Sequence, residues 1–141
     1  MDKVIFACVH NAGRSQMAAA WFNHLVDPSR ATAVSAGTRP ADRVHPLVVE
    51  AMREVGVDIG HNRPQQLTDD LAQGVGILIT MGCGDECPHL PGLERDDWPL
   101  PDPKDRPLDE VRRIRDDIRA RVTGLIEARF TVREEKTIRR R

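Results

Sequence analysis

The residues best suited to chemistry lie close together near the start of the chain. Cys8 follows a short apolar run, and Arg14 and Ser15 come six and seven positions later. A thiolate is a strong nucleophile, a guanidinium binds two oxygens of an anion at once, and a hydroxyl can donate a hydrogen bond to sulfur. These three side chains predict a site where sulfur attacks a bound oxyanion. The residues between them are Val9, His10, Asn11, Ala12 and Gly13.

The elements around this segment support that prediction. A β-rich run, 4–7, precedes Cys8, and a helical pattern begins at about Arg14. A loop that opens a helix can turn successive N–H groups toward one point at the positive end of the helix dipole. We therefore expect residues 9–15 to bind the substrate. The competing interpretation is a buried structural cysteine with Arg14 as a surface charge.

Two further cysteines follow the most apolar strand pattern, 77–81. Cys83 and Cys87 have glycines at positions 82 and 84 around the first of them. Side chains at i and i+4 of a helix have Cβ atoms about 5–6 Å apart, whereas a disulfide needs roughly 3.5–4.5 Å. A bond between them therefore requires local unwinding, which glycine permits. The pair could instead belong to a metal site with His89, or consist of inert thiols.

Asp102 lies in a proline-rich stretch, 82–107, and is followed by Pro103. A carboxylic acid near the reacting anion can protonate a departing oxygen, but a solvated turn aspartate fits the sequence equally well.

The composition predicts one ordinary globular domain. The chain has 141 residues, 40% of them hydrophobic and 30% charged, with a net charge of -1. We expect a domain over residues 1–131 and a charged tail over 132–141. No run is long enough for a membrane span, and no leader pattern opens the sequence. The three cysteines, odd in number, favour thiol chemistry in the cytoplasm over a secreted disulfide framework.

The hydrophobic periodicity predicts a class α/β fold. Strands that alternate with helices imply βαβ units and a mostly parallel sheet, here three-layered with helices on both faces. The C-terminal helix is rich in arginine, but arginine alternating with aspartate favours a solvated face, so we expect no nucleic-acid partner. The predicted strands are 4–8, 31–36, 77–81 and a short one within 93–98; the predicted helices are 14–26, one capped by Asp42 and running to about 55, a short one capped by Thr68, and one from 109 to beyond 126.

The pattern Cys8-x5-Arg14-Ser15 on a strand, loop and helix resembles the low-molecular-weight protein tyrosine phosphatases. The continuation Gln16-Met17-Ala18, with Trp21, resembles their arsenate reductase branch, as do Ser35-Ala36-Gly37 and the stretch from Met81 to Pro103. This resemblance implies a four-stranded parallel sheet and makes Asp102 the general acid. Ala19 stands where some relatives use a glutamate at a potassium site, so we expect no metal.

The resemblance also implies a reaction and a partner. Cys8 would attack arsenate, Cys83 would then attack Cys8 and release arsenite, and Cys87 would move the disulfide outward to a thioredoxin-like reductant. No bound cofactor is expected, and phosphate or sulfate should mimic the substrate. Tyrosine is absent and aromatic residues total 4%, which disfavours phosphotyrosine.

Three alternatives stay open at this point. One is a phosphatase of small phosphorylated substrates that uses only Cys8, Arg14 and Asp102. Another is an arsenate reductase that depends on mycothiol or glutathione, through a mycoredoxin or glutaredoxin. The third is a redox-sensing or anion-binding module without turnover.

Overall fold

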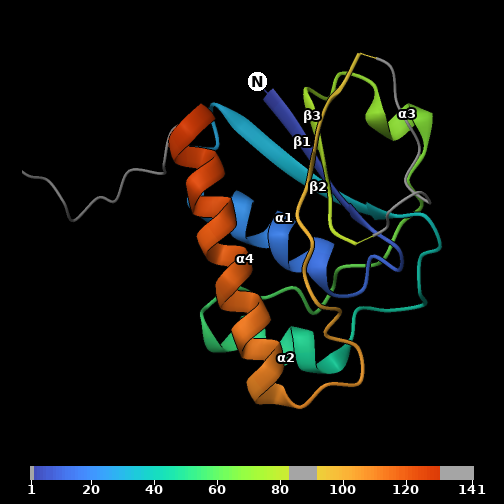
Figure 1. Cartoon of the computed structure of the whole chain (residues 1–141), viewed down its shortest axis with the longest axis vertical. Coiled ribbons are helices and arrows are strands. Elements are labelled where there is room, and N and C mark those ends of the chain that lie inside the picture. Colours follow the sequence, from blue (N-terminus) through green and yellow to red (C-terminus); the bar gives the residue numbers. More distant parts are fainter. Residues whose placement is uncertain (1, 83–91, 131–141) are drawn as a thin grey trace, which may run out of the picture.

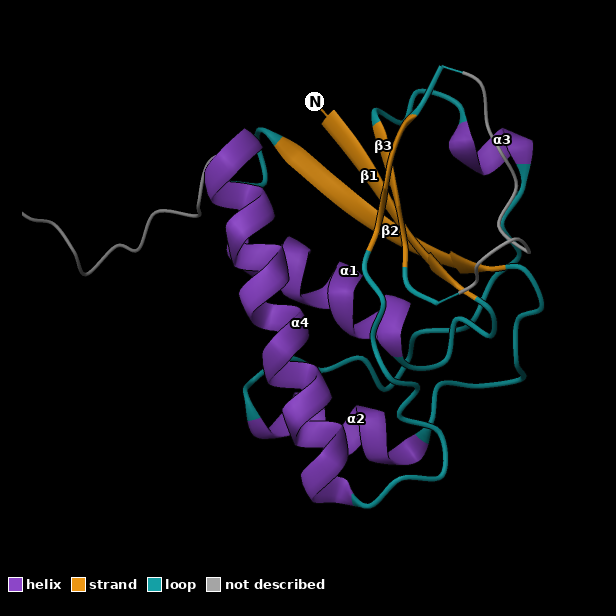
Figure 2. Cartoon of the chain, viewed as in Figure 1, coloured by secondary structure: helices purple, strands orange, loops and turns teal. Residues whose placement is uncertain are grey.

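The computed structural model describes residues 2–82 and 92–130 and confirms the predicted α/β class (Figure 1, Figure 2). Cys83, Cys87 and the predicted tail lie outside the described residues. The elements in chain order are β1 (Asp2–Cys8), α1 (Arg14–Leu25), β2 (Ala31–Gly37), α2 (Pro46–Glu54), α3 (Asp69–Ala72), β3 (Ile77–Thr80), β4 (Glu94–Asp97) and α4 (Leu108–Arg129).

The four strands form one parallel sheet in the order β2-β1-β3-β4. In β1, Ala7 pairs with Ala36 of β2 and with Thr80 of β3. Because all strands run in the same direction, β1 and β3 end side by side at one edge. The segments that follow Cys8 and Thr80 therefore start next to each other, at the edge where parallel sheets bind ligands.

Both faces of the sheet are covered, as predicted, but unequally. Val4 and Phe6 of β1 belong to the larger core cluster, which includes residues of α1, α2 and α4. Ile5 and Ala7, on the other face, pack in a smaller cluster that Leu71 of α3 completes. The alternation along β1 explains this division, since successive side chains of a strand point to opposite faces. Figure 2 shows α4, α1 and α2 together on one side and α3 on the other.

Helix α2 begins later than the sequence predicts, and Asp42 does not cap it. The helix starts at Pro46, and His45 is the residue before its first turn. Proline suits this position because its fixed φ matches a helix and its missing N–H has no helical acceptor there. Thr68, by contrast, caps α3 as predicted: its hydroxyl accepts a hydrogen bond from the Leu71 N–H at 3.1 Å.

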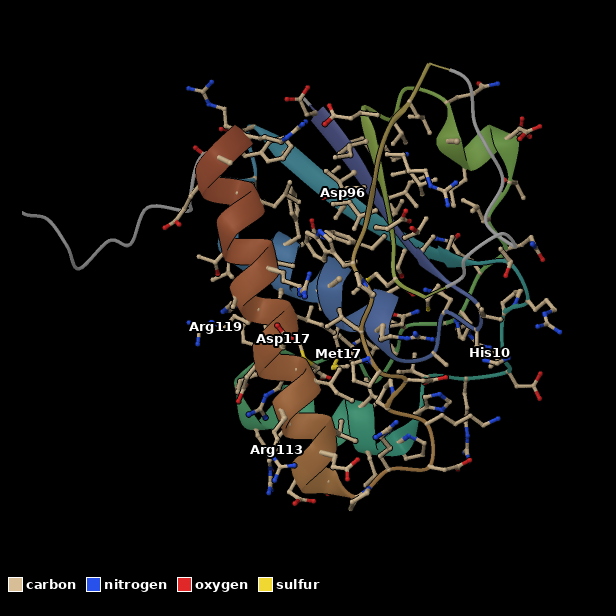
Figure 3. All side chains as sticks on the ribbon, viewed as in Figure 1. His10, Met17, Asp96, Arg113, Asp117 and Arg119 are labelled. Carbon is tan, nitrogen blue, oxygen red and sulfur yellow. The ribbon has the colours of Figure 1, made fainter. Side chains whose placement is uncertain are left out.

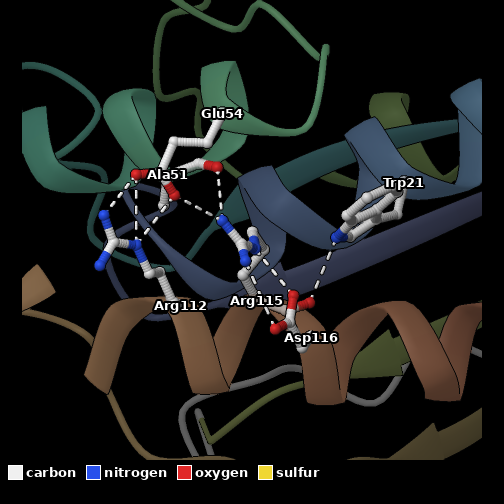
Figure 4. Close-up of polar contacts among 6 residues, drawn as sticks. All are labelled: Trp21, Ala51, Glu54, Arg112, Arg115 and Asp116. Atoms are coloured by element: carbon white, nitrogen blue, oxygen red, sulfur yellow. Dashed lines mark hydrogen bonds and ion pairs between the residues drawn. The ribbon is translucent and has the colours of Figure 1, made fainter. Parts of the chain in front are cut away.

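Arg115 of α4 is buried, although the helix pattern predicts that its arginines face water. Its Nη1 donates to the Ala51 carbonyl and to a Glu54 carboxylate oxygen, both at 2.9 Å (Figure 4). The Trp21 indole N–H donates to the Arg115 carbonyl at 3.2 Å. Arg115 therefore joins α4 to α2 and α1, and these polar contacts compensate its burial.

No helix among the described residues has both the length and the apolar composition that crossing a bilayer requires.

Candidate active site

Backbone hydrogen bonds from segment 38–45 to the carbonyl groups of the loop between β1 and α1 hold this loop in place. The carbonyls of Val9, His10 and Ala12 accept hydrogen bonds from the backbone N–H groups of Arg39, Ala41 and His45, at 2.8, 2.9 and 2.9 Å. Segment 38–45 thus runs along the loop and fixes the orientation of its peptide planes.

The N–H groups of the same loop are left available. Within the described part of the chain, the amides of residues 10–13 donate to no protein acceptor. They stand where α1 begins, at the positive end of the helix dipole. A loop with occupied carbonyls and amides that no described acceptor uses, at a helix N-terminus, can bind an anion.

Cys8 ends β1 at the base of this loop as a free thiol, with only 2% of its surface exposed. Its Sγ lies 2.9 Å from the Ser15 hydroxyl oxygen, which in turn is 2.7 Å from Asn11 Nδ2. The direction of the bond between Asn11 and Ser15 can be deduced. The Gln65 backbone N–H can only donate, and it lies 2.9 Å from Asn11 Oδ1.

Asn11 therefore presents its nitrogen to Ser15 and donates to the hydroxyl. The Ser15 proton is then free to point at the Cys8 sulfur. A hydroxyl that donates to sulfur stabilises the thiolate, the form that attacks an electrophile.

Arg14 supplies a fixed positive charge beside the loop. Its residue is 8% exposed, its Nη1 donates to the Leu100 carbonyl at 3.1 Å, and its Nη2 lies 3.6 Å from Asp102 Oδ2. The guanidinium thus faces the loop that carries Asp102 as well as its own. Gly82, just after β3, makes room for it: a Cβ at Gly82 would lie 2.1 Å from Arg14 Nη1.

Asp102 lies beside the loop, although it is far from Cys8 in the sequence. One carboxylate oxygen faces Arg14, and the other accepts the Lys104 N–H at 3.0 Å. Pro103 lies against the loop so closely that a Cβ on Gly13 would be 2.6 Å from its Cγ. The Asp102 side chain is 42% exposed, so water has access to its carboxylate beside Arg14.

The predicted site residues thus divide into two groups. The structure brings together the described ones, which are Cys8, Val9, His10, Asn11, Ala12, Gly13, Arg14, Ser15 and Asp102. Cys83 and Cys87 lie outside the described residues, but the segment that carries them starts beside Arg14 at Gly82. Figure 3 shows His10 well apart from the charged side chains Arg113, Asp117 and Arg119 of α4.

His45 is a site residue that the sequence analysis missed. Its N–H holds the Ala12 carbonyl, and a Cβ on Gly13 would lie 3.5 Å from its ring. Burial lowers the pKa of the His45 imidazole below 6.5; Asp102 opposes this shift, and Lys104 and His10 add to it. Burial therefore favours the uncharged form of the ring, which lies beside Gly13 of the loop. The signal in the sequence was Pro46, which makes the preceding residue a helix cap.

Comparison with known proteins now assigns this arrangement to a family. The sequence pattern of the family described as "Low molecular weight phosphotyrosine protein phosphatase" matches residues 3–137. The chain belongs to this family. "Arsenate reductase 2" of Staphylococcus epidermidis is 32% identical over 128 residues, which cover 86% of this chain and 95% of that protein.

Solved structures of arsenate reductases agree with the fold. A thioredoxin-dependent arsenate reductase of Corynebacterium glutamicum superposes with a TM-score of 0.78 and 41% identity, over 91% of this chain and 61% of that one. This chain therefore spans about three fifths of the Corynebacterium protein. A structure titled "An arsenate reductase in the phosphate binding state" superposes with a TM-score of 0.79 and 31% identity, over 91% and 98% of the two chains.

Proposed function

We propose that this protein reduces arsenate to arsenite, with Cys8 as the nucleophile. The observation that carries the proposal is the Cys8 thiol, hydrogen-bonded to Ser15 beneath a loop of unused amide groups and next to the Arg14 guanidinium. The similarity to arsenate reductases over most of the chain supports arsenate as the oxyanion.

The first step would join sulfur to arsenic. The Cys8 thiolate attacks the arsenic(V) of bound arsenate, an As–O bond breaks, and the oxygen leaves as water. Asp102 would supply the proton for this departing oxygen, which is worth about 10²–10⁴ in rate. The loop amides and Arg14 would hold the remaining oxygens and their negative charge.

The second step would reduce the arsenic. The Cys83 thiolate attacks the Cys8 sulfur, the S–As bond breaks, and its electron pair stays on arsenic, which leaves as arsenite(III). Two thiols have then lost two electrons and become a Cys8–Cys83 disulfide. Cys87 attacks Cys83, frees Cys8, and leaves a Cys83–Cys87 disulfide for an external dithiol to reduce.

The external reductant we propose is a thioredoxin-like protein. Three cysteines are enough to carry the oxidation away from Cys8, and the similar Corynebacterium enzyme is thioredoxin-dependent. A reductant of this kind places the reaction in the cytoplasm, where thiols are kept reduced. A mycoredoxin or glutaredoxin, with its small thiol, is the alternative partner.

A phosphatase that acts on small phosphorylated substrates is a second candidate, and the position of Asp102 beside Arg14 favours it. The same cysteine, guanidinium and acid can form and hydrolyse a phosphocysteine without any other thiol.

One pair of assays separates these functions. The protein is incubated with arsenate, thioredoxin, thioredoxin reductase and NADPH, and separately with an aryl phosphate. We expect NADPH oxidation that depends on arsenate, lost in both Cys8→Ser and Cys83→Ser. The Cys83→Ser variant should still form one stoichiometric Cys8 adduct.

Hydrolysis of the aryl phosphate without arsenate-dependent oxidation would establish the phosphatase instead. No activity in either assay would favour a binding or sensing module without turnover. Full multiple turnover by Cys83→Ser with thioredoxin would refute the thiol relay.

A further inference from the structure

Gln16 lies in the first turn of α1 and is almost fully buried, with 3% of the residue exposed; its side chain is hydrogen-bonded to Asn11 and Asn62. Its Nε2 donates to the Asn11 carbonyl at 3.1 Å and to Asn11 Oδ1 at 3.3 Å. Its Oε1 accepts from Asn62 Nδ2 at 3.2 Å. Every polar atom of this buried amide is therefore used.

Both hydrogen bonds that Gln16 donates go to one residue, Asn11, whose backbone is strained. Asn11 has a φ of +50°, the left-handed region that asparagine tolerates but does not prefer. Gln16, on the helix, donates a hydrogen bond to the backbone carbonyl of Asn11. The Gln65 N–H, in segment 62–65, donates to the side-chain oxygen of Asn11. Asn11 is thus fixed from two sides in the conformation that lets its nitrogen reach Ser15.

An apolar side chain would fill this helix position at a smaller desolvation cost than a buried amide. The amide is useful here because, together with the Gln65 N–H, it holds Asn11 in the orientation that a chain of hydrogen bonds requires. Asn62 donates to Gln16, Gln16 donates to Asn11, Asn11 donates to Ser15, and the Ser15 hydroxyl is left to donate to Cys8.

We propose that Gln16, oriented by Asn62, is a positioning residue that keeps the Cys8 sulfur reactive by holding Asn11 and, through it, the Ser15 hydroxyl. It acts without touching the substrate. The proposal rests on the proposed role of Cys8 as nucleophile, but it concerns the reactivity of that sulfur and is independent of which oxyanion is bound.

The test measures the reactivity of Cys8 directly. In a Cys83→Ser/Cys87→Ser background, Cys8 is the one remaining thiol, and its alkylation by iodoacetamide is followed from about pH 5 to 10. The rate at each pH is divided by the plateau rate at high pH. This normalised rate measures the fraction of Cys8 that is thiolate, because the effect of limited access to the buried sulfur cancels. Gln16→Met keeps the length of the side chain and removes its hydrogen bonds.

We expect Gln16→Met to move the profile about one pH unit upward. The normalised rate should then fall about tenfold at pH values below the midpoint of the profile, where the thiolate is the minor form. Asn62→Ala changes an exposed residue. It should move the profile in the same direction by about half as much, and it tests the proposal even if Gln16→Met fails to fold.

Asn23→Ala is the matched control. Asn23 lies on the same helix, and its amide exchanges hydrogen bonds of 2.9 and 2.8 Å with the Ala33 backbone. Loss of those contacts should lower thermal stability and leave the alkylation profile where it was.

A wild-type profile in folded Gln16→Met or Asn62→Ala would overturn the proposal, and so would an equal shift in Asn23→Ala. The proposed function is judged separately, by arsenate-dependent turnover in the chain with all its cysteines. A shifted profile in a protein that does not reduce arsenate would uphold the positioning role and refute the reductase. An unshifted profile in a protein that does reduce arsenate would refute the positioning role and uphold the reductase.

Discussion

Substituting Gly82 by alanine should disable the anion site by moving one guanidinium. A Cβ at position 82 would lie 2.1 Å from Arg14 Nη1 and 3.1 Å from its Cζ, whereas ordinary contacts begin at 3.4 Å. The guanidinium must therefore withdraw by more than about 1 Å from its place beside the Leu100 carbonyl and Asp102. Since it is the end of a flexible side chain, the protein can still fold. A displacement of about 1 Å at a catalytic group costs about 10²-fold in rate.

The substitution also strains the backbone, because Gly82 has a φ of +92°. The left-handed conformation costs a residue with a Cβ about 1–2 kcal/mol. Gly74→Ala is the control for this term: Gly74 has a φ of +76°, and a Cβ there would meet nothing within 4 Å. Both variants should lose similar thermal stability, and Gly82→Ala alone should lose the 10²-fold in kcat/KM for arsenate.

The assay is arsenate-dependent NADPH oxidation with thioredoxin and its reductase, together with a thermal unfolding curve for each variant. If folded Gly82→Ala keeps kcat/KM within about threefold of the wild type, Arg14 does not bind the substrate from the position described. If Gly74→Ala loses activity to the same degree, the loss comes from backbone strain and the reasoning from the Arg14 contact is refuted.

Three further outcomes follow from the site and its supports. Asp102→Asn should lower arsenate turnover by about 10²–10⁴ because it removes the proton donor, while Cys8 alkylation at neutral pH stays unchanged; slowed alkylation would contradict this role. Gly13→Ala should push Pro103 and with it Asp102 away, since the new Cβ would lie 2.6 Å from Pro103 Cγ; pre-steady-state kinetics should show a slower chemical step, and an unchanged step would contradict the contact. Hydrogen bonds from Arg112, then Arg115, lower the pKa of Glu54 from 4.5 to about 2. The stability that this pair contributes is present above about pH 4.5 and is lost as the pH falls through about 2. Thermal unfolding should therefore find Glu54→Gln less stable than the wild type at neutral pH and equal to it below pH 2; a difference that persists in acid would contradict this assignment.

The sequence predicts the helices and strands well where hydrophobic periodicity and the residues that begin or end an element agree. β1 is a buried run, and α1 shows its inner face through Met17 and Trp21, both fully or almost fully buried. The beginning of α2 is less readable. Asp42 and Pro46 both signal a helix start, and the outcome depends on the backbone hydrogen bond between His45 and Ala12, a contact between distant elements.

The type of sheet could be predicted from the sequence, but the burial of a charged residue on a covering helix could not. The alternation of strands and helices predicts a parallel sheet, and a short strand within 93–98 is found as β4. The burial of Arg115 depends on Ala51 and Glu54, which α2 brings from more than sixty positions earlier. A helical pattern alone shows such an arginine as one more residue on a polar face.

The candidate site is readable at its centre, because strand, cysteine, loop, arginine and helix are contiguous. Its outer parts are not. The hydrogen bond from Gln65 to Asn11 and the space that Gly82 leaves for Arg14 join residues fifty or more positions apart. Such contacts depend on tertiary packing. The sequence therefore identifies the chemical groups of the site but does not show how they are oriented.

The central claim is that arsenate takes its two electrons from the thiols of this chain, starting at Cys8. Fully reduced protein, with its three thiols, is mixed with excess arsenate in the absence of any other reductant; arsenite and remaining thiols are then counted after denaturation. The account predicts about one arsenite per chain and a fall from three thiols to one, with no change in Cys8→Ser. Three intact thiols and no arsenite would contradict it.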